Sequence, residues 1–332
     1  MIIIEKTKTR KDISSMLKKS YRGRNLGLAL IIVGAGCWGL SSPMMEWLFS
    51  HQKMSAPALL QFRFMLSGVI LLLIAMGRKQ NIWKVWTDLR MVLSLLIFSV
   101  CGIMVLQYAF ISTVETGNAV TATLFQFLSP AVVMIVLAFK KRKPPTWIET
   151  VLVSLCIIGL FFMVTNGSLE GISLSPKAVG WGLATAVAFA FYTLFPVPLI
   201  RRWGGTLVLG WGMLIGGIVF NALPVSGGFY SAVQGMDIIS WILVLFIVLF
   251  GTCLAFLFYL ESLHYLEPAE TNTLSVMEPL VTIVVSMLWL AEPLKFFQIM
   301  GGLFIVASSV LLSVKPWDKR ARGGERTASE GL

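Results

Sequence analysis

The sequence predicts an all-α membrane protein with ten transmembrane helices, arranged as two inverted five-helix repeats. Three observations lead to this prediction. First, 57% of the 332 residues are hydrophobic and only 13% are charged, whereas about 25% of residues are charged in a soluble domain. Second, Lys and Arg concentrate in alternate loops between apolar stretches. Third, prolines and tyrosines recur at separations of about 150 residues, which indicates that the second half of the chain repeats the pattern of the first.

Ten apolar stretches are long enough to cross the hydrocarbon core of a bilayer, which takes about 20 helical residues at a rise of about 1.5 Å each. Basic or turn-forming segments, such as 140–145 and 166–168, separate these stretches. The loops are too short to hold a soluble domain. In chain order, the expected spans are 26–47, 57–76, 91–112, 118–139, 146–165, 177–199, 206–224, 238–261, 269–290 and 296–314.

The distribution of basic residues predicts the orientation of the chain. With a cytoplasmic N-terminus, the cytoplasmic segments hold 23 Lys and Arg, the outer segments hold three, and Arg63 within a span completes the 27. Segments rich in Lys and Arg are translocated poorly, so both termini are expected in the cytoplasm and the protein in the plasma membrane. Residues 1–25 and 315–332 then form basic cytoplasmic segments. The formal charge of +11 reflects this orientation, and we expect no nucleic-acid partner.

An internal repeat is visible in pairs of residues that hold the same place in each half. Pro130 and Pro279 lie within apolar stretches 149 residues apart, and Tyr108 and Tyr259 lie 151 residues apart. The pairs predict two five-helix units, 26–165 and 177–314. Because five is odd, the second unit must insert upside down. Inverted repeats are typical of transporters with a substrate site near the membrane midplane, although a channel or a scaffold can also use a duplicated fold.

Two charged residues fall deep within the predicted spans, where ionisable groups are costly and commonly functional. Glu278 precedes Pro279, whose missing N–H frees a carbonyl one turn earlier and allows a kink. A carboxylate beside a kink suits a cation or ammonium site. The Arg63 guanidinium is a fork that can receive a substrate carboxylate. The alternative is structural, with the two side chains paired to each other or to polar groups. Glu261, near the end of a span, is a third candidate.

Other polar and aromatic side chains in the spans predict the rest of a largely apolar substrate site. They are Trp38, Gln107, Tyr108, Gln126, Tyr192, Tyr259 and Asn272. For each of them, packing within the helix bundle is the alternative. Pro130 and Pro279 are expected to be hinges or, alternatively, static kinks. Gly212 and Gly216 form a GxxxG motif, which predicts close helix packing within the fold or in a homodimer.

Enzyme classes find little support in the sequence. The two histidines, His51 and His264, lie near helix ends, and all four aspartates lie outside the spans. The four cysteines show no CxxC spacing, and no phosphate-binding glycine loop with Lys-Ser or Lys-Thr occurs. We therefore expect no enzyme activity, no metal and no cofactor. A channel and a non-transporting scaffold remain alternatives, although the polar residues are scattered and do not form the continuous stripe of a pore.

Several short motifs occur in order along the chain: Cys37-Trp38-Gly39, Arg63-Phe64, Ser129-Pro130, Glu278-Pro279 and Glu292-Pro293. Their order over residues 26–314 resembles the ten-helix EamA-type branch of the drug/metabolite transporter superfamily. Lys143 departs from the family pattern, because the first repeat usually carries a Glu there like Glu292 of the second. The resemblance implies a secondary transporter that exports or exchanges amino acids or related metabolites without ATP hydrolysis. Its partners would be a small-molecule substrate and the lipid bilayer, and its state a monomer or a homodimer.

Overall fold

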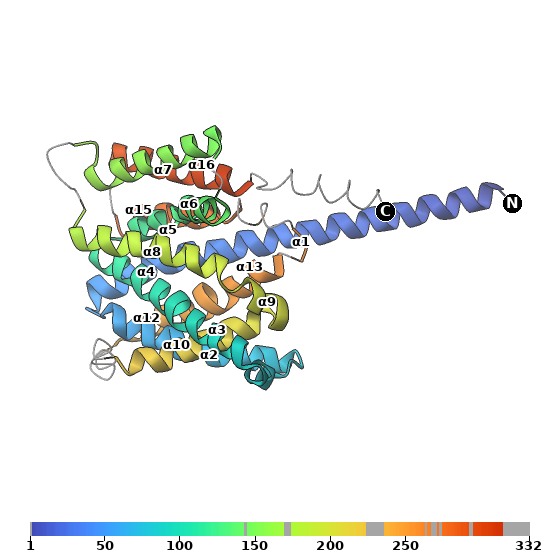
Figure 1. Cartoon of the computed structure of the whole chain (residues 1–332), viewed down its shortest axis with the longest axis horizontal. Coiled ribbons are helices and arrows are strands. Elements are labelled where there is room, and N and C mark those ends of the chain that lie inside the picture. The colour runs from blue at the N-terminus through green and yellow to red at the C-terminus, as the bar shows by residue number, and fades with distance from the viewer. Residues whose placement is uncertain are drawn as a thin grey trace.

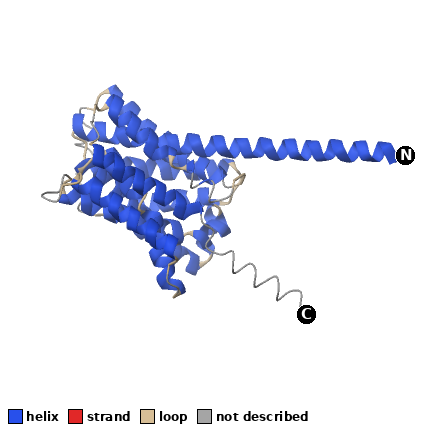
Figure 2. Ribbon diagram, turned by 90° about the horizontal axis from the view of Figure 1, so that it is seen from above, coloured by secondary structure: helices blue, strands red, loops and turns tan. Residues whose placement is uncertain are grey.

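The computed structural model describes residues 2–142, 145–168, 174–223, 236–262, 264–266, 271, 274–291 and 295–314, with side chains from Gly23 onward. These residues contain helices and turns but no strand, which confirms the all-α prediction for the described part of the chain. The helices form one bundle, and the first helix, α1 (Ile2–His51), projects far beyond one end of it (Figures 1 and 2).

The described helices fall into two successive sets, one within residues 2–168 and one within residues 174–314. In the first set α1 is followed by α2 (Ala56–Gly77), the 3-10 helix η1 (Ile82–Thr87), α3 (Leu89–Ile97), the π-helical η2 (Phe98–Met104), α4 (Val105–Thr116), α5 (Ala119–Gln126), α6 (Ser129–Lys141) and α7 (Trp147–Thr165). The second set contains α8 (Pro176–Leu194), α9 (Val197–Trp203), α10 (Gly205–Asn221), α12 (Ile238–Val248), the π-helical η4 (Leu249–Leu254), α13 (Ala255–Ser262), α15 (Met277–Trp289) and α16 (Phe296–Val314).

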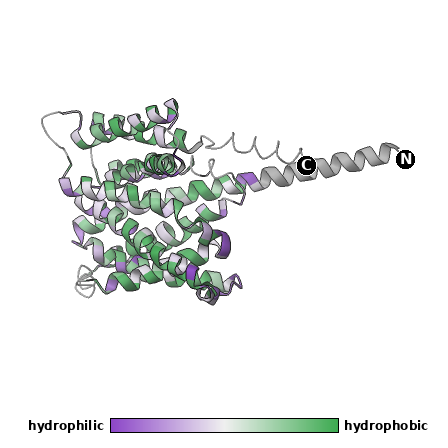
Figure 3. Ribbon diagram, in the orientation of Figure 1, coloured by the Kyte–Doolittle hydropathy of each residue, from purple (hydrophilic) through white to green (hydrophobic). Residues whose placement is uncertain are grey.

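Seven helical stretches among the described residues are long and apolar enough to cross a membrane. The pair α9 and α10, bent by 118° at Gly204, makes up to eight, and α15 and α16 are shorter apolar helices. Apolar residues predominate along the bundle, and polar residues gather at its two ends (Figure 3). Each predicted span overlaps helices of the described residues, with three differences. α1 begins at Ile2, well before the predicted residue 26, and the stretch 118–139 is divided between α5 and α6. In the stretch 269–290, Thr271 and Leu274 are helical and α15 begins at Met277 after a turn.

Polar residues begin several of the helices. Thr146 and Glu149 form a capping box at α7, in which each side chain bonds the backbone N–H of the other. Asp88 accepts the N–H groups of Arg90 and Met91 at the start of α3, and Asp237 accepts that of Ser240 at the start of α12. These acceptors satisfy N–H groups that have no partner inside the helix, and so fix where each helix begins.

Pro130 and Pro279 lie at the beginnings of helices, which corrects the expectation that each would lie in the middle of a continuous helix. A turn at residues 127–128 separates α5 from α6, and a turn at 275–276 precedes α15. Proline has no N–H and clashes with the preceding turn, whereas it is tolerated in the first turn of a helix. The regular helix is therefore interrupted by a turn before each proline, although residues 119–140 still form one apolar stretch long enough to span a membrane. Whether the breaks act as hinges remains a prediction.

Helices of the two sets pack against each other in a reciprocal pattern. α2 packs on α10, and α7 packs on α16. α1 lies along α13 and α15, while α8 lies along α4, α5 and α6. The GxxxG motif belongs to this packing: a Cβ on Gly216 would lie 3.1 Å from the carbonyl oxygen of Ser99, and one on Gly212 would strike Ile103. Of its two predicted uses, close packing within the fold is therefore the one observed.

Two ion pairs join the sets at the end of the bundle from which α1 projects, where α9 also lies (Figure 1). Arg202 of α9 lies 2.8 Å from the carboxylate of Asp88, and Arg78 after α2 lies 3.9 Å from that of Glu261. Glu261 is 38% exposed. It is thus a partner in an ion pair at the rim of the bundle, which corrects its prediction as a deep residue.

The Asp88 cap predicts a pH dependence of stability. The N–H of Met91, followed by the nearby Arg202, holds the pKa of Asp88 below its ordinary value of 3.8. The stability that Asp88 contributes is therefore complete well above pH 3.8 and is lost as the pH falls through the lower folded value. An Asp88→Asn variant keeps a capping side chain but does not titrate. We expect the difference in melting temperature between wild type and variant to shrink on acidification to pH 3, and a constant difference would contradict this assignment.

Candidate functional site

Glu278 lies in the first turn of α15 with its side chain only 4% exposed. Its partner is Gln126, the last residue of α5, whose Nε2 donates to Oε1 at 3.2 Å and to Oε2 at 3.4 Å. No cationic side chain among the described residues lies within 4.0 Å of the carboxylate. An ionised carboxylate offers about four lone-pair sites, so one amide leaves most of its accepting capacity unused. The site is suited to bind a proton or a cationic group.

Helix α1 approaches the start of α15 very closely at Gly39. A Cβ at this position would lie 2.5 Å from the carbonyl oxygen of Glu278, so a larger residue cannot fit there without moving the backbone. The Thr282 hydroxyl lies 3.2 Å from the carbonyl oxygen of Gly39 and 3.0 Å from that of Glu278, so its one hydrogen is shared between these two acceptors. The glycine of the Trp38-Gly39 motif therefore allows α1 to pack against the turn that carries Glu278.

Arg63 is buried in α2, with 5% of its surface exposed. Its Nε donates to the Thr252 hydroxyl in η4 at 3.2 Å, and Nη1 donates to the Met45 sulfur in α1 at 3.7 Å. No carboxylate of the described residues lies within 4.0 Å of the guanidinium. Arg63 and Glu278 therefore do not pair with each other, which removes the mutual ion pair as the structural alternative.

The two buried charges contact different parts of α1. Arg63 touches Met45, whereas the turn of Glu278 touches Gly39. Six residues separate these contacts, which corresponds to about 9 Å along the helix axis and about 120° around it. Each charge also links the two helix sets, because Arg63 bonds Thr252 and Gln126 bonds Glu278.

Three of the predicted aromatic residues meet in one group. The Trp38 ring lies 5.0 Å from that of Phe256 and 5.7 Å from that of Tyr259. Tyr192 continues the group, with its ring 5.4 Å from Phe98 and 6.2 Å from Phe256. We refer to these five residues as the aromatic cluster. Its members come from α1, η2, α8 and α13, so the cluster draws on both helix sets.

The remaining predicted residues lie elsewhere or are not described. Tyr108 packs against Trp181 and Phe220, at ring distances of 5.2 and 5.6 Å, and is not part of the aromatic cluster. Gln107 is buried in α4. Asn272 lies outside the described residues.

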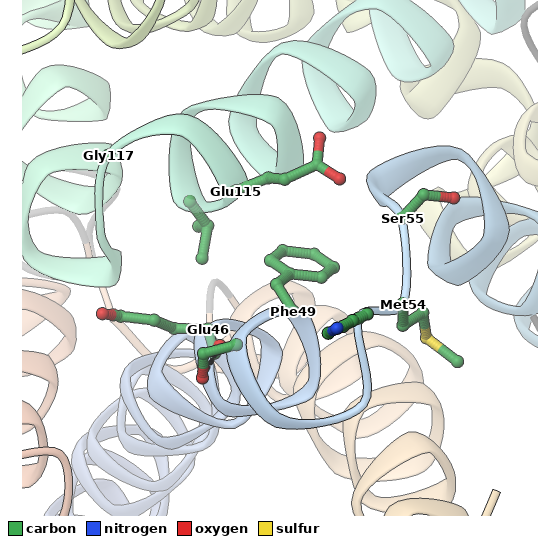
Figure 4. A pocket seen from close by; sticks show the side chains of 9 residues that line it. Glu46, Phe49, Met54, Ser55, Glu115 and Gly117 are labelled. Carbon is green, nitrogen blue, oxygen red and sulfur yellow. Dashed lines mark hydrogen bonds between the residues drawn. The ribbon is translucent and has the colours of Figure 1, made fainter.

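Two glutamates that the sequence did not single out line a cavity of about 380 Å³ at the other end of the bundle, where α1 ends (Figure 4). Glu115 accepts the N–H of Ala56, the first residue of α2, at 2.8 Å. Glu46 accepts the N–H of Ala119, the first residue of α5, also at 2.8 Å. Each glutamate therefore caps the start of a helix other than its own: Glu115 of α4 caps α2, and Glu46 of α1 caps α5. Glu46 lay inside a predicted span, which was the signal that could have identified it.

Comparisons with known proteins agree on the family. The model of the EamA-like transporter family matches residues 25–165 and, a second time, residues 176–314. YicL, an uncharacterised inner membrane transporter of Salmonella typhimurium, is 32% identical over 296 residues, which are 89% of this chain and 97% of the relative. YwfM, an uncharacterised transporter of Bacillus subtilis, is 22% identical over 302 residues, 88% of this chain and 95% of the relative.

A solved crystal structure shares the fold, with a TM-score of 0.55 and 15% identity, over 88% of this chain and 97% of its own. The family model covers nearly all of the described helices in two consecutive copies. The resemblance seen in the motifs is thereby confirmed, and the chain belongs to the EamA-like transporter family of membrane transporters.

Proposed function

We propose that this protein is a secondary transporter that exports or exchanges small metabolites, amino acids or related compounds, across the plasma membrane by alternating access. The observation that carries the proposal is a helix break at the same place in each copy of the family unit, before Pro130 and before Pro279, with the buried Glu278 at one of them. Broken helices at the interface of inverted repeats are where transporters of this kind bind substrates and coupling ions.

An inverted arrangement of ten spans accounts for the helix packing. Ten spans result when α9 and α10 count as one and α15 and α16 count as one each. In this arrangement α1 corresponds to α8, α4 to α13, α2 to α10 and α7 to α16. Exchanging corresponding helices turns the α1–α13 contact into the α8–α4 contact, and it leaves the α2–α10 and α7–α16 contacts unchanged. The ion-paired Arg78 and Arg202 lie at the end from which α1 projects. The positive-inside tendency assigns this end, and both termini, to the cytoplasm.

The hydrogen bond between Gln126 and Glu278 joins the two halves, whose relative movement is the basis of alternating access. Gln126 belongs to the first half and Glu278 to the second, so rocking of the halves against each other changes the environment of the carboxylate. A proton or a substrate ammonium group that binds Glu278 more tightly in one state than in the other shifts the balance between the states. This difference in affinity is the coupling that alternating access requires, and it needs no ATP.

Counterflow in proteoliposomes tests the proposal. Vesicles that contain the purified full-length chain are loaded with an unlabelled amino acid mixture and diluted into labelled amino acids, with protein-free vesicles as the control. A carrier accumulates the label transiently above its equilibrium level, because entry of label is exchanged for exit of unlabelled substrate. Equilibration without an overshoot, together with unitary currents in planar bilayers, would favour the channel alternative. No flux of any amino acid or related metabolite would contradict the proposed substrate class.

A further inference from the structure

The Arg63 guanidinium has bonding capacity that the described residues do not use. A guanidinium carries five N–H donors, and Arg63 bonds only a hydroxyl through Nε and a sulfur, which is a weak acceptor, through Nη1. No described residue accepts from Nη2. A buried cation without a counter-ion is costly in any protein interior, and more so within a membrane. The guanidinium is therefore positioned to receive an anionic group that the described residues do not supply.

Two carboxylates that lie on α1 or beside it, those of Glu46 and Glu278, are engaged elsewhere. Glu46 follows Met45 directly, but its Oε2 accepts the N–H of Ala119. Glu278 accepts from Gln126 and approaches α1 at Gly39, on a different side of that helix from Met45.

The aromatic cluster includes residues that follow closely after Thr252, the residue that accepts from Arg63. Phe256 and Tyr259 follow Thr252 by four and seven residues, on the helical stretch that η4 and α13 form together. On α1, Trp38 and Met45 are seven residues apart and share a face. Contacts show that α1 and this helical stretch meet here. Met45 and Thr252 both bond Arg63, and Trp38 packs on Phe256 and Tyr259. A cation thus lies at one end of an apolar, aromatic surface.

We propose that Arg63, oriented by Thr252, binds the carboxylate of a substrate whose apolar body lies against the aromatic cluster. The substrate class is an aryl- or alkyl-substituted carboxylate. The inference rests on the proposed transport function, and it names one subsite within it. Thr252 and Phe256 are only four residues apart on this helical stretch, so a short linker between carboxylate and ring fits best. The compound 3-phenylpropionate has this form.

Binding to the purified full-length protein in detergent tests the subsite without transport. The probes are 3-phenylpropionate, the neutral 3-phenylpropan-1-ol and the cationic 3-phenylpropylamine, titrated while the melting temperature and Trp fluorescence are recorded. The wild type is expected to bind the acid in preference to the other two. Arg63→Gln is expected to weaken binding of the acid by about 10- to 100-fold, as the loss of a charge-assisted bond does, and Arg63→Lys by less. Arg90→Gln, at an exposed arginine, is the matched control and is expected to bind like the wild type.

A second variant keeps the test decisive if Arg63→Gln does not fold. Thr252→Val removes the hydroxyl that accepts from Nε and leaves the side-chain volume nearly unchanged, and it is expected to weaken binding of the acid but not of the alcohol. Equal binding of acid and alcohol by the wild type would overturn the proposal, as would chloride that competes as effectively as the acid. Acid binding without counterflow refutes the transport function alone, whereas counterflow without acid binding refutes the subsite alone.

Discussion

Replacement of Glu278 by Gln is expected to abolish counterflow while the protein still inserts and purifies like the wild type. Gln has nearly the same shape and can still bond Gln126, so the packing around Gly39 and Thr282 is retained. It cannot take up a proton or attract a cation. A charge-assisted contact is worth up to about 3 kcal/mol, which corresponds to a loss of flux on the order of 100-fold in proteoliposomes.

Glu149→Gln is the matched control for this substitution. Glu149 completes the capping box of α7, and Gln serves in that position as well as Glu. The control is therefore expected to transport like the wild type. Flux of Glu278→Gln within a few-fold of wild type would reject the role of the carboxylate. If a pH gradient imposed across the vesicle membrane drives no accumulation by the wild type, and a protonophore leaves its uptake unchanged, the carboxylate binds a substrate cation and does not couple transport to protons.

Gly301→Ala is expected to lower stability, although Gly→Ala in the middle of a helix usually raises it by about 1 kcal/mol. α7 and α16 cross with Gly159 facing Gly301. A Cβ on Gly301 would strike the carbonyl oxygen of Gly159 and lie 2.9 Å from the N of Met163. These are backbone atoms, so the clash can be relieved only by separating the helices. Overpacking of this kind costs about 1 to 3 kcal/mol.

Gly180→Ala provides the comparison, because a Cβ on Gly180 in α8 would meet no atom within 4 Å. Melting temperatures of the purified proteins in one detergent measure both variants. The structure predicts opposite signs, with a fall of several degrees for Gly301→Ala and no change or a small rise for Gly180→Ala. Equal shifts for the two variants would mean that α7 and α16 do not pack through these glycines.

Hydrophobic length and proline positions allowed most helices to be located from the sequence, but not the form of the ninth span. Pro279 predicts that the helix is interrupted near this position. A kink and a break differ only in how the preceding turn is hydrogen-bonded, and the sequence does not show this difference. In the structure residues 275–276 form a turn, and α15 starts afresh at Met277. The bend at Gly204 was missed for a similar reason. Its positive φ of 82° is one that glycine adopts readily, but many glycines in helices do not adopt it.

The composition of the candidate site was easier to predict than its connections. Glu278, Arg63 and Gln126 stood out because polar groups are costly at depth. Their partners did not, since Arg63 and Thr252 are 189 residues apart in the chain and Gln126 and Glu278 are 152 apart. Helical periodicity says which residues share a face but not which helix that face meets. For this reason Tyr259 joins Trp38 while Tyr108, its counterpart in the repeat, packs against Trp181.

The π-helical segments η2 and η4 bear on the ancestry of the chain. A π-helical turn accommodates an inserted residue, and every residue beyond the insertion is turned by about 100° relative to those before it. Phe98 and Leu249, where the two segments begin, are 151 residues apart, and so are Tyr108 and Tyr259 beyond them. The insertion is thus in register in both halves. One gene duplication of a half that already carried the insertion explains this, whereas separate insertions would have had to arise in the same helical turn twice.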